Sequence, residues 1–259
     1  MRTVRIAVAT LVCCALAGCQ TDDALFEEVP PAEELWAQGE EELEGFSVLG
    51  FFDYVDYQAA IDTFQSIVDN YPSSTYAVQA ELKIADAYFA DDKFEEALSY
   101  YRDFGDLHPD HPQVPYTIWR SALCHERRRL EPSRDQGATR DALVFLDRLL
   151  MQYPFSEYAV EAEVLWRELQ TVLAENVEVI ADFYFERGEY EASAERYRAL
   201  LNEYPGLGLD PRVLYKLGAC YAELRRVDEA DRIFRTVVTH YGESEYAFLA
   251  RERLATNLP

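Results

Sequence analysis

The sequence is poor in basic charge, in glycine and proline, and in cysteine. Its 259 residues include 24 Lys and Arg against 48 Asp and Glu, which gives a formal charge of −24. Because nucleic-acid binding needs a basic surface, this balance excludes nucleic acid as a partner. With 11 Gly, 11 Pro and 5 Cys, the chain is neither a fibre, a turn-rich β-sandwich nor a disulfide scaffold. Hydrophobic residues still make up 49% of the chain, which is enough for a folded core.

Long hydrophobic runs are also absent, except at the N-terminus. The run Ile6–Leu16 follows a short basic start and is shorter than the roughly 20 residues that a membrane-spanning helix needs. The tetrad Leu16-Ala17-Gly18-Cys19 matches the lipobox of bacterial lipoproteins, in which the cysteine thiol takes the lipid. We therefore expect a lipoprotein signal peptide over residues 1–18 and lipidation of Cys19. An ordinary secretory signal cut near the same place is the alternative.

The residues after Cys19 indicate where the chain is anchored. In Lol-type sorting, an Asp after the lipidated cysteine retains a lipoprotein in the inner membrane, so Gln20 favours the outer membrane. Several acyl chains on one cysteine would make this anchoring stable. Residues 19–31 are acidic and contain Pro30 and Pro31, which is typical of a tether. We expect the rest of the chain to face the periplasm.

The body of the chain is built from a repeated pattern. A small residue is followed four positions later by a large one, usually apolar or aromatic, and twelve positions later by Pro or Gly. Upstream of three of these sets, a second small residue and an aromatic residue stand at fixed offsets. The five sets are Ala60/Phe64/Pro72, Ala97/Tyr101/Pro109, Ala142/Leu146/Pro154, Ser193/Tyr197/Pro205 and Ala230/Phe234/Gly242, and the upstream pairs are Ala85/Tyr88, Ala181/Tyr184 and Gly218/Tyr221.

This order of small, aromatic and breaker residues is the tetratricopeptide (TPR) pattern. Small residues let two helices approach closely, and the breaker ends the second helix. Because each hairpin is amphipathic, neighbouring hairpins must stack to bury their apolar faces. We predict an all-α, TPR-like α-solenoid of five helix-turn-helix repeats with a C-terminal capping helix. The predicted domain covers residues 32–259, with repeats at 32–74, 75–111, 112–156, 157–207 and 208–243 and a cap at 244–256.

The spacing of the repeats is irregular. The small anchors lie 37, 45, 51 and 37 residues apart, whereas ideal TPRs repeat every 34 residues. The excess in the first repeat predicts an insertion around Gly45–Tyr54, and the excess in the third predicts one around Arg127–Thr139. The long interval before the fourth repeat predicts an extra or extended helix over Glu157–Ala174, where apolar residues recur at helical spacing.

With these repeats in place, the chain resembles the BamD family, the TPR lipoproteins of the outer-membrane β-barrel assembly (BAM) machinery. A lipobox precedes five TPR-like repeats in a chain of the expected size. The segment HPDHPQVPY at 108–116 looks like that family's link between its second and third repeats, and Arg134-Asp135-Gln136 looks like its entry to the next helix. Tyr184, Glu186-Arg187-Gly188 and Arg196 look like its fourth repeat. The resemblance covers residues 32–255.

The resemblance implies a periplasmic scaffold, lipid-anchored to the outer membrane, that assists insertion of outer-membrane proteins by protein–protein binding. Its expected partners are a BamA-like barrel subunit bound through a POTRA domain, unfolded outer-membrane proteins and accessory lipoproteins. In the family, an Arg of the fourth repeat pairs with a POTRA carboxylate, and Arg196 stands at that position, with Tyr184 and Arg187 near it. The residues alone also allow a pair of Arg196 with Glu191 or Glu195. The alternative function is another TPR lipoprotein, such as a secretin pilot or a cell-envelope coordination factor.

Offsets from the small anchors predict which residues line the concave face, where TPR arrays bind. In the N-terminal half this face is rich in aromatic and apolar residues, which suits an extended peptide, and packing between repeats is an equal alternative. The predicted groove residues are Trp36, Gln79, Leu82, Phe89, Tyr116, Trp119 and Leu123, together with Asp86. In the C-terminal half the same face reads Glu175, Glu178, Asp182, Phe185 and Glu186. This acidic face would either bind a basic partner or be solvated.

No chemical site emerges from the remaining residues. His108 and His111 could be half of a metal site, but the prolines beside them favour a rigid turn and no further ligand is near in the sequence. The chain has neither a glycine-rich phosphate loop nor a nucleophile beside a base. We therefore expect no catalytic residue, no metal site and no cofactor.

Two further features have simple structural explanations. Cys124 and Cys220 occupy equivalent positions two repeats apart, too far for a disulfide, so we expect buried free thiols. One basic cluster, Glu126–Arg129 with Arg134 and Arg140, is either a contact for an acidic partner or a solvated loop.

Overall fold

The computed structural model describes residues 29–48 and 52–256. Cys19 and the tether residues before Val29 lie outside these ranges. In the described part, eleven α-helices and one β-hairpin follow one another. The elements are α1 Ala32–Glu44, β1 Phe46–Val48, β2 Phe52–Tyr54, α2 Tyr57–Asn70, α3 Thr75–Ala90, α4 Phe94–Leu107, α5 Val114–Arg127, α6 Gly137–Gln152, α7 Ala159–Glu186, α8 Tyr190–Glu203, α9 Asp210–Glu223, α10 Val227–His240 and α11 Glu245–Ala255.

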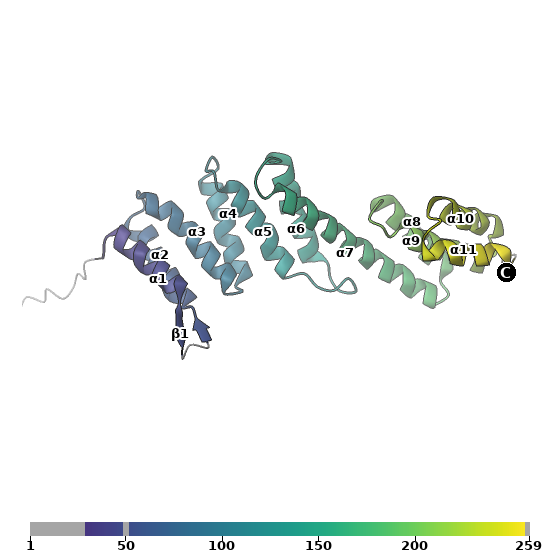
Figure 1. The fold of residues 1–259 in the computed structure, drawn as a ribbon, viewed down its shortest axis with the longest axis horizontal. Helices are drawn as coiled ribbons and strands as arrows, with labels where there is room; N and C mark the ends of the chain where they lie inside the picture. Colours follow the sequence, from purple (N-terminus) through teal and green to yellow (C-terminus); the bar gives the residue numbers. More distant parts are fainter. Residues whose placement is uncertain (1–28, 49–51, 257–259) are drawn as a thin grey trace, which may run out of the picture.

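The helices stack into an elongated solenoid. Each helix packs mainly against the helices before and after it in the sequence, and α11 covers the end by contacting α9 and α10. Figure 1 shows the ten helices α1–α10 arranged as five successive hairpins from one end of the molecule to the other. The prediction of an all-α, TPR-like solenoid with five hairpins and a capping helix is confirmed.

Small residues hold the hairpins together as the pattern predicted. A Cβ atom on Gly39 of α1 would lie 2.7 Å from Cζ of Phe64 on α2. A Cβ atom on Gly218 of α9 would lie 2.8 Å from Cε1 of Phe234 on α10. Since real Cβ atoms do not approach so closely, any larger residue would separate the two helices of its hairpin. Ala85 and Ala181 occupy the corresponding buried positions on α3 and α7.

Helix α7 joins two halves of the core. It runs unbroken for 28 residues, so the expected extra segment is continuous with the first helix of the fourth repeat. Its first half packs Leu169 and Leu173 into the cluster formed with α5 and α6. Its second half packs Ala181 into the cluster formed with α8–α11. The N-terminal and C-terminal halves are thus connected through this one long helix (Figure 1).

The insertion in the first repeat forms a small β-hairpin between α1 and α2. Strands β1 and β2 pair antiparallel, with Phe46 opposite Tyr54 and Val48 opposite Phe52. The repeat spacing predicted the insertion but not its strands. The inserted segment lies outside the helical repeat pattern, and its aromatic and β-branched residues favour strands.

Candidate protein-binding surfaces

The first helices of the N-terminal repeats enclose a hollow of about 460 Å³. Trp36 of α1, Gln79 and Leu82 of α3, and Tyr116 of α5 line it, as predicted. We call this the N-terminal hollow, and its full lining is Trp36, Gln79, Leu82, Lys83, Asp86, His111, Gln113 and Tyr116. Helices α1, α3 and α5 are the first helices of their hairpins, so the hollow lies on the predicted concave face.

One wall of the N-terminal hollow is aromatic and carries a cation. The half-buried ring of Trp36 packs against Phe64 and Tyr76, with ring centroids 5.4 and 5.6 Å apart. The Nζ atom of Lys83 lies 5.7 Å from the Trp36 ring and 2.5 Å from Oε1 of Glu40. This packing holds the indole in place, so that its uncovered part is available to a ligand without a change of conformation.

Asp86 fixes the opposite wall. Its Oδ1 atom accepts hydrogen bonds from the hydroxyl groups of Tyr101 and Tyr116, both at 2.5 Å. Arg120 donates from Nε to the Tyr101 hydroxyl at 2.9 Å. Burial, and then the adjacent Asp86 carboxylate, raise the pKa of Tyr101 and of Tyr116, so both phenols remain neutral donors. The Asp86 carboxylate therefore has its hydrogen-bond donors within the wall of the hollow.

Three of the predicted groove residues lie outside this hollow. Phe89 packs edge-on against Phe94 at 5.2 Å, and the Arg120 guanidinium covers its ring at 3.7 Å. Trp119 packs against the core of α5, α6 and α7. Leu123 is half-buried and does not reach the hollow. Phe89 and Trp119 pack against side chains of neighbouring helices, which is the alternative that the offsets left open, and the contact of all three residues with a peptide stays a prediction.

The C-terminal half repeats the arrangement of an Asp, a Tyr and a cation that borders the N-terminal hollow. We call this arrangement the frame, and other side chains around it differ. Asp182, Tyr197, Arg212 and Lys216 stand 96 residues after Asp86, Tyr101, Tyr116 and Arg120, respectively. Asp182, Arg212 and Lys216 line a second hollow, of about 440 Å³, which we call the C-terminal hollow. Its full lining is Glu131, Pro132, Ser133, Glu175, Glu178, Val179, Asp182, Arg212 and Lys216. Within it, Glu178 replaces the Leu82 of the N-terminal hollow and Arg212 replaces Tyr116.

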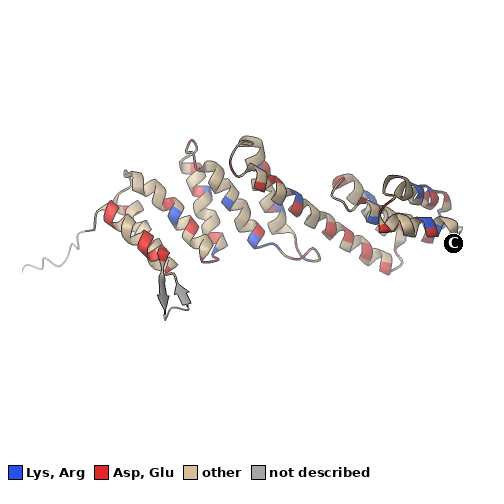
Figure 2. Cartoon of the chain, viewed as in Figure 1, with Lys and Arg blue, Asp and Glu red and all other residues tan. Residues whose placement is uncertain are grey.

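Ion pairs neutralise much of the acidity of the C-terminal hollow. Glu178, only 4% exposed, accepts from Arg212 Nη2 at 2.5 Å and from Lys216 Nζ at 2.8 Å. Lys216 also contacts Asp182 at 2.7 Å, and the Tyr197 hydroxyl donates to the same carboxylate. Burial lowers the pKa of Lys216, but the hydrogen bonds to Asp182 and Glu178 outweigh it and the net shift is upward. Figure 2 shows acidic residues along α7, and of these Glu178 and Asp182 form ion pairs with Arg212 and Lys216 of α9.

The residues expected to dock a partner meet at the junction of α7 and α8. The guanidinium of Arg196 lies 5.0 Å from the Tyr184 ring centroid, and that of Arg187 lies 5.4 Å from the Phe183 ring. Phe183 is 54% exposed. Within the described residues Arg196 forms no ion pair, and Glu191 pairs with Arg226 at 3.2 Å. We call Phe183, Tyr184, Arg187 and Arg196 the docking patch.

A family model described as an outer membrane lipoprotein, YfiO, matches residues 31–233. The chain belongs to the YfiO family of outer membrane lipoproteins. Both hollows and the docking patch lie within the matched region.

Curated relatives of this YfiO-family chain carry one name. An outer membrane protein assembly factor BamD from Neisseria gonorrhoeae is 27% identical over 254 residues, covering 94% of this chain and 91% of that protein. BamD from Caulobacter vibrioides is 26% identical over 227 residues, covering 86% of this chain and 72% of that protein. Among solved structures, the TPR2AB domain of yeast Sti1 aligns with 87% of this chain and 84% of that chain, at 13% identity and a TM-score of 0.45.

The other candidate site residues of this YfiO-family chain are held by contacts within the protein. His108 lies 2.8 Å from Oε2 of Glu81 and packs against Phe104, and the described residues contain no cluster of ligands able to hold a metal ion. Cys124 and Cys220 are buried and unpaired, and burial raises the pKa of their thiols to about 12 and about 11. None of the helices described here combines the length and hydropathy needed to cross a membrane.

The basic cluster is paired in part with neighbouring carboxylates. Arg128 reaches Glu95 on α4 at 2.5 Å, and Arg129 contacts Glu126 at 3.2 Å. Arg134 and Arg140 are exposed and form no ion pair among the described residues, so these two cations are available to an acidic partner. The cations in or beside the two hollows are Lys83, Arg120, Arg212 and Lys216, which the sequence analysis did not single out. The recurrence at 96 residues is the signal that could have found three of them.

Proposed function

We propose that this chain is an outer membrane protein assembly factor, a scaffold of the β-barrel assembly machinery that acts by binding. The membership in the YfiO family and the name shared by its relatives support this role. Its anchor would be a lipid on Cys19 in the outer membrane, with the solenoid facing the periplasm. Each surface of the solenoid would then hold a different partner.

The N-terminal hollow would receive an extended segment of an unfolded outer-membrane protein. Its aromatic wall is the observation that carries this proposal, because Trp36, Leu82 and Tyr116 offer apolar contact while Gln79 and Gln113 offer hydrogen bonds to a peptide backbone. Strands of outer-membrane barrels alternate apolar and polar residues, and such a segment matches a hollow with both kinds of lining.

The docking patch would hold a BamA-like barrel subunit through a POTRA domain. Arg196 is exposed and unpaired among the described residues, and its stacking on Tyr184 orients the guanidinium. A guanidinium presents two parallel N–H donors to a carboxylate, a geometry that Lys cannot offer. In a chain with a net charge of −24, such a cation suits a carboxylate on a partner.

The test measures binding of a fluorescent peptide that corresponds to the C-terminal strand of an outer-membrane protein. Trp36→Ala should weaken binding about tenfold, because a buried aromatic anchor contributes strongly to an interface. The matched control is Trp166→Ala, which truncates a half-buried Trp on α7 whose Nε1 donates to Asp147 at 2.8 Å, outside the hollow. Equal affinities for the two folded variants would exclude the N-terminal hollow as the peptide site.

The wider role is tested by purification from detergent-solubilised membranes. A large β-barrel protein with POTRA domains should accompany the chain, whereas recovery of a secretin would instead support a pilot protein. In the same experiment, Cys19→Ser should remove palmitate labelling. Unchanged labelling would contradict the lipid anchor.

A further inference from the structure

The most exposed apolar side chains of the molecule lie along one edge of the solenoid. Figure 1 shows the α2–α3, α4–α5 and α6–α7 turns along this edge, which is the upper one in that view. The described chain begins at the same edge, because the hydroxyl group of Tyr71 at the α2–α3 turn donates to the carbonyl oxygens of Val29 and Pro30, at 3.1 and 2.9 Å. We name it the tether edge, and it consists of the turns and adjoining helix ends at residues 29–31, 71–74, 108–113 and 153–158.

Four side chains on the tether edge are the most exposed large apolar ones in the described residues. Phe155 in the α6–α7 turn is 99% exposed, Met151 near the end of α6 is 82% exposed and Val160 at the start of α7 is 72% exposed. Leu107, the last residue of α4, is 68% exposed. Single exposed apolar residues are common on protein surfaces, but three of these four flank one turn. Packing within the chain does not account for them.

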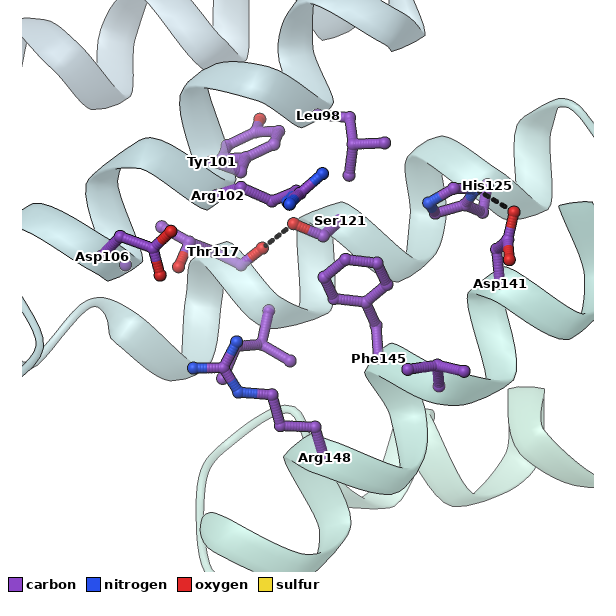
Figure 3. A pocket seen from close by; sticks show the side chains of 13 residues that line it. Leu98, Tyr101, Arg102, Asp106, Thr117, Ser121, His125, Asp141, Phe145 and Arg148 are labelled. Atoms are coloured by element: carbon purple, nitrogen blue, oxygen red, sulfur yellow. Dashed lines mark hydrogen bonds and ion pairs between the residues drawn. The ribbon is translucent and has the colours of Figure 1, made fainter.

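The charges near these apolar side chains are of both signs. Figure 3 shows Arg148 of α6 and Asp106 of α4 at one end of the hollow between these two helices. Arg148 lies one turn before the end of α6, and Asp106 is the last residue but one of α4. Around the α6–α7 turn, Glu157 and Glu161 are exposed. A zwitterionic lipid surface suits this mixture, whereas a strongly anionic one would repel the carboxylates.

The predicted lipid would hold the tether edge close to the membrane. Ten residues, 19–28, run from the predicted lipid site to Val29, and ten fully extended residues span at most about 35 Å. With the lipid inserted, the start of α1 and the Tyr71 turn beside it would lie within about that distance of the bilayer. One attachment leaves the solenoid free to turn, whereas a second contact on the same edge fixes its orientation.

We propose that the tether edge rests on the membrane, with Phe155, Met151 and Val160 inserted between lipid headgroups. This inference rests on the lipid anchor proposed above and adds a second attachment, at the α6–α7 turn. Apolar side chains at such a turn gain free energy as their area leaves water for the membrane interface. Helix α7, with 28 residues and a length of about 40 Å, would then carry the docking patch at its other end away from the bilayer (Figure 1).

The test measures how deeply a fluorescent probe at position 155 lies in lipid. The full lipidated chain with Phe155→Cys is labelled with nitrobenzoxadiazole and reconstituted into phosphatidylcholine vesicles that carry nitroxide groups on their acyl chains. Cys124 and Cys220 are buried, so they do not compete for the label. Side chains in the interface lie about 5–10 Å deep, so the nitroxides should quench this probe at least about threefold more than a probe at Leu130→Cys. Leu130 is the matched control, because it is exposed in the α5–α6 loop on the opposite edge.

A second probe position leaves the proposed contact residues in place. A probe at Val160→Cys should be quenched as well, and Phe155→Ser with Met151→Ser should reduce that quenching about threefold. Circular dichroism confirms that the variants fold. Equal quenching at positions 155 and 130, or unchanged quenching at position 160 in the folded double variant, would overturn the proposal.

Flotation of the same vesicles separates this proposal from the lipid anchor on Cys19. If the chain floats and the probe at position 155 is not quenched, the anchor stands and the membrane contact of the tether edge is overturned. If the chain does not float, the anchor is wrong, and a polyhistidine tag in place of residues 1–19 then holds the chain on nickel-chelating lipids. Quenching at position 155 above that at position 130 supports the proposal there too, and equal quenching overturns it.

Discussion

The N-terminal and C-terminal hollows are built on one frame and lined by different chemistry. In both, an Asp on a first helix accepts a hydrogen bond from a Tyr on the following second helix, and a cation approaches from the next first helix. The N-terminal hollow adds Leu82 and Tyr116 to this frame. The C-terminal hollow adds Glu178 and Arg212 at the same two positions.

This difference separates the roles of the two halves. An aromatic hollow can bind apolar peptide at little cost of desolvation, whereas ion pairs must be broken before a peptide replaces them. The ionic network in the C-terminal half links α7 to α9, and we expect a partner in that half to bind at the exposed docking patch. Substitutions at matched positions can test both statements.

The largest effect is expected from Glu178→Ala. It leaves Arg212 and Lys216, each about a third exposed, without their buried partner. Loss of one member of a buried ionic network costs about 3–5 kcal/mol, and solvent reaching these two cations reduces this to about 2–3 kcal/mol. Urea unfolding followed by circular dichroism measures it. The control, Glu175→Ala on the same helix, should change stability by less than about 0.5 kcal/mol. Equal effects of the two variants would show that the network does not stabilise this half.

Arg196→Glu should weaken capture of the barrel subunit more than tenfold, about 1.4 kcal/mol or more, because it places like charges together. Binding of the fluorescent peptide at the N-terminal hollow should not change. A reciprocal Arg in the partner should restore capture, and Arg198→Glu, an exposed neighbour on α8, is the control. Wild-type capture by Arg196→Glu over a range of salt would remove this residue from the interface.

The two frames should also differ in alkaline solution. In the folded chain the pKa values of Tyr101, Tyr116 and Tyr197 are raised, chiefly by burial. Unfolded tyrosines ionise near pH 10, so their contribution to stability is complete below about pH 10 and is lost as the pH rises above it. Each Tyr→Phe change should reduce the slope of this loss of stability with pH by up to about 1.4 kcal/mol per pH unit. Tyr101→Phe with Tyr116→Phe should therefore flatten it about twice as much as Tyr197→Phe, measured by urea unfolding between about pH 9 and 11. The opposite order would contradict the count of buried phenols in the two frames.

The repeat pattern predicted the helices better than the surfaces. Small anchors such as Ala85 and Ala181 report close packing within a hairpin, which is a local property of the sequence. The lining of a hollow also depends on neighbouring helices, so the offsets could not show that Arg120 covers Phe89. For the same reason the sequence of α7 alone could not predict that cations of α9 pair with Glu178 and Asp182. The resemblance named Tyr184 and Arg196 together, and the structure places the Arg196 guanidinium 5.0 Å from the Tyr184 ring, whereas their docking role stays a prediction.

The most direct measurement transfers the C-terminal lining to the N-terminal hollow. The double variant Leu82→Glu/Tyr116→Arg places at these positions the residues that the chain already carries at Glu178 and Arg212. Because the C-terminal half accommodates them on the same frame, we expect a folded protein that still captures the barrel subunit. Its affinity for the C-terminal segment of an outer-membrane protein should fall by more than about tenfold. Wild-type affinity for that peptide in the folded double variant would contradict the assignment of the N-terminal hollow.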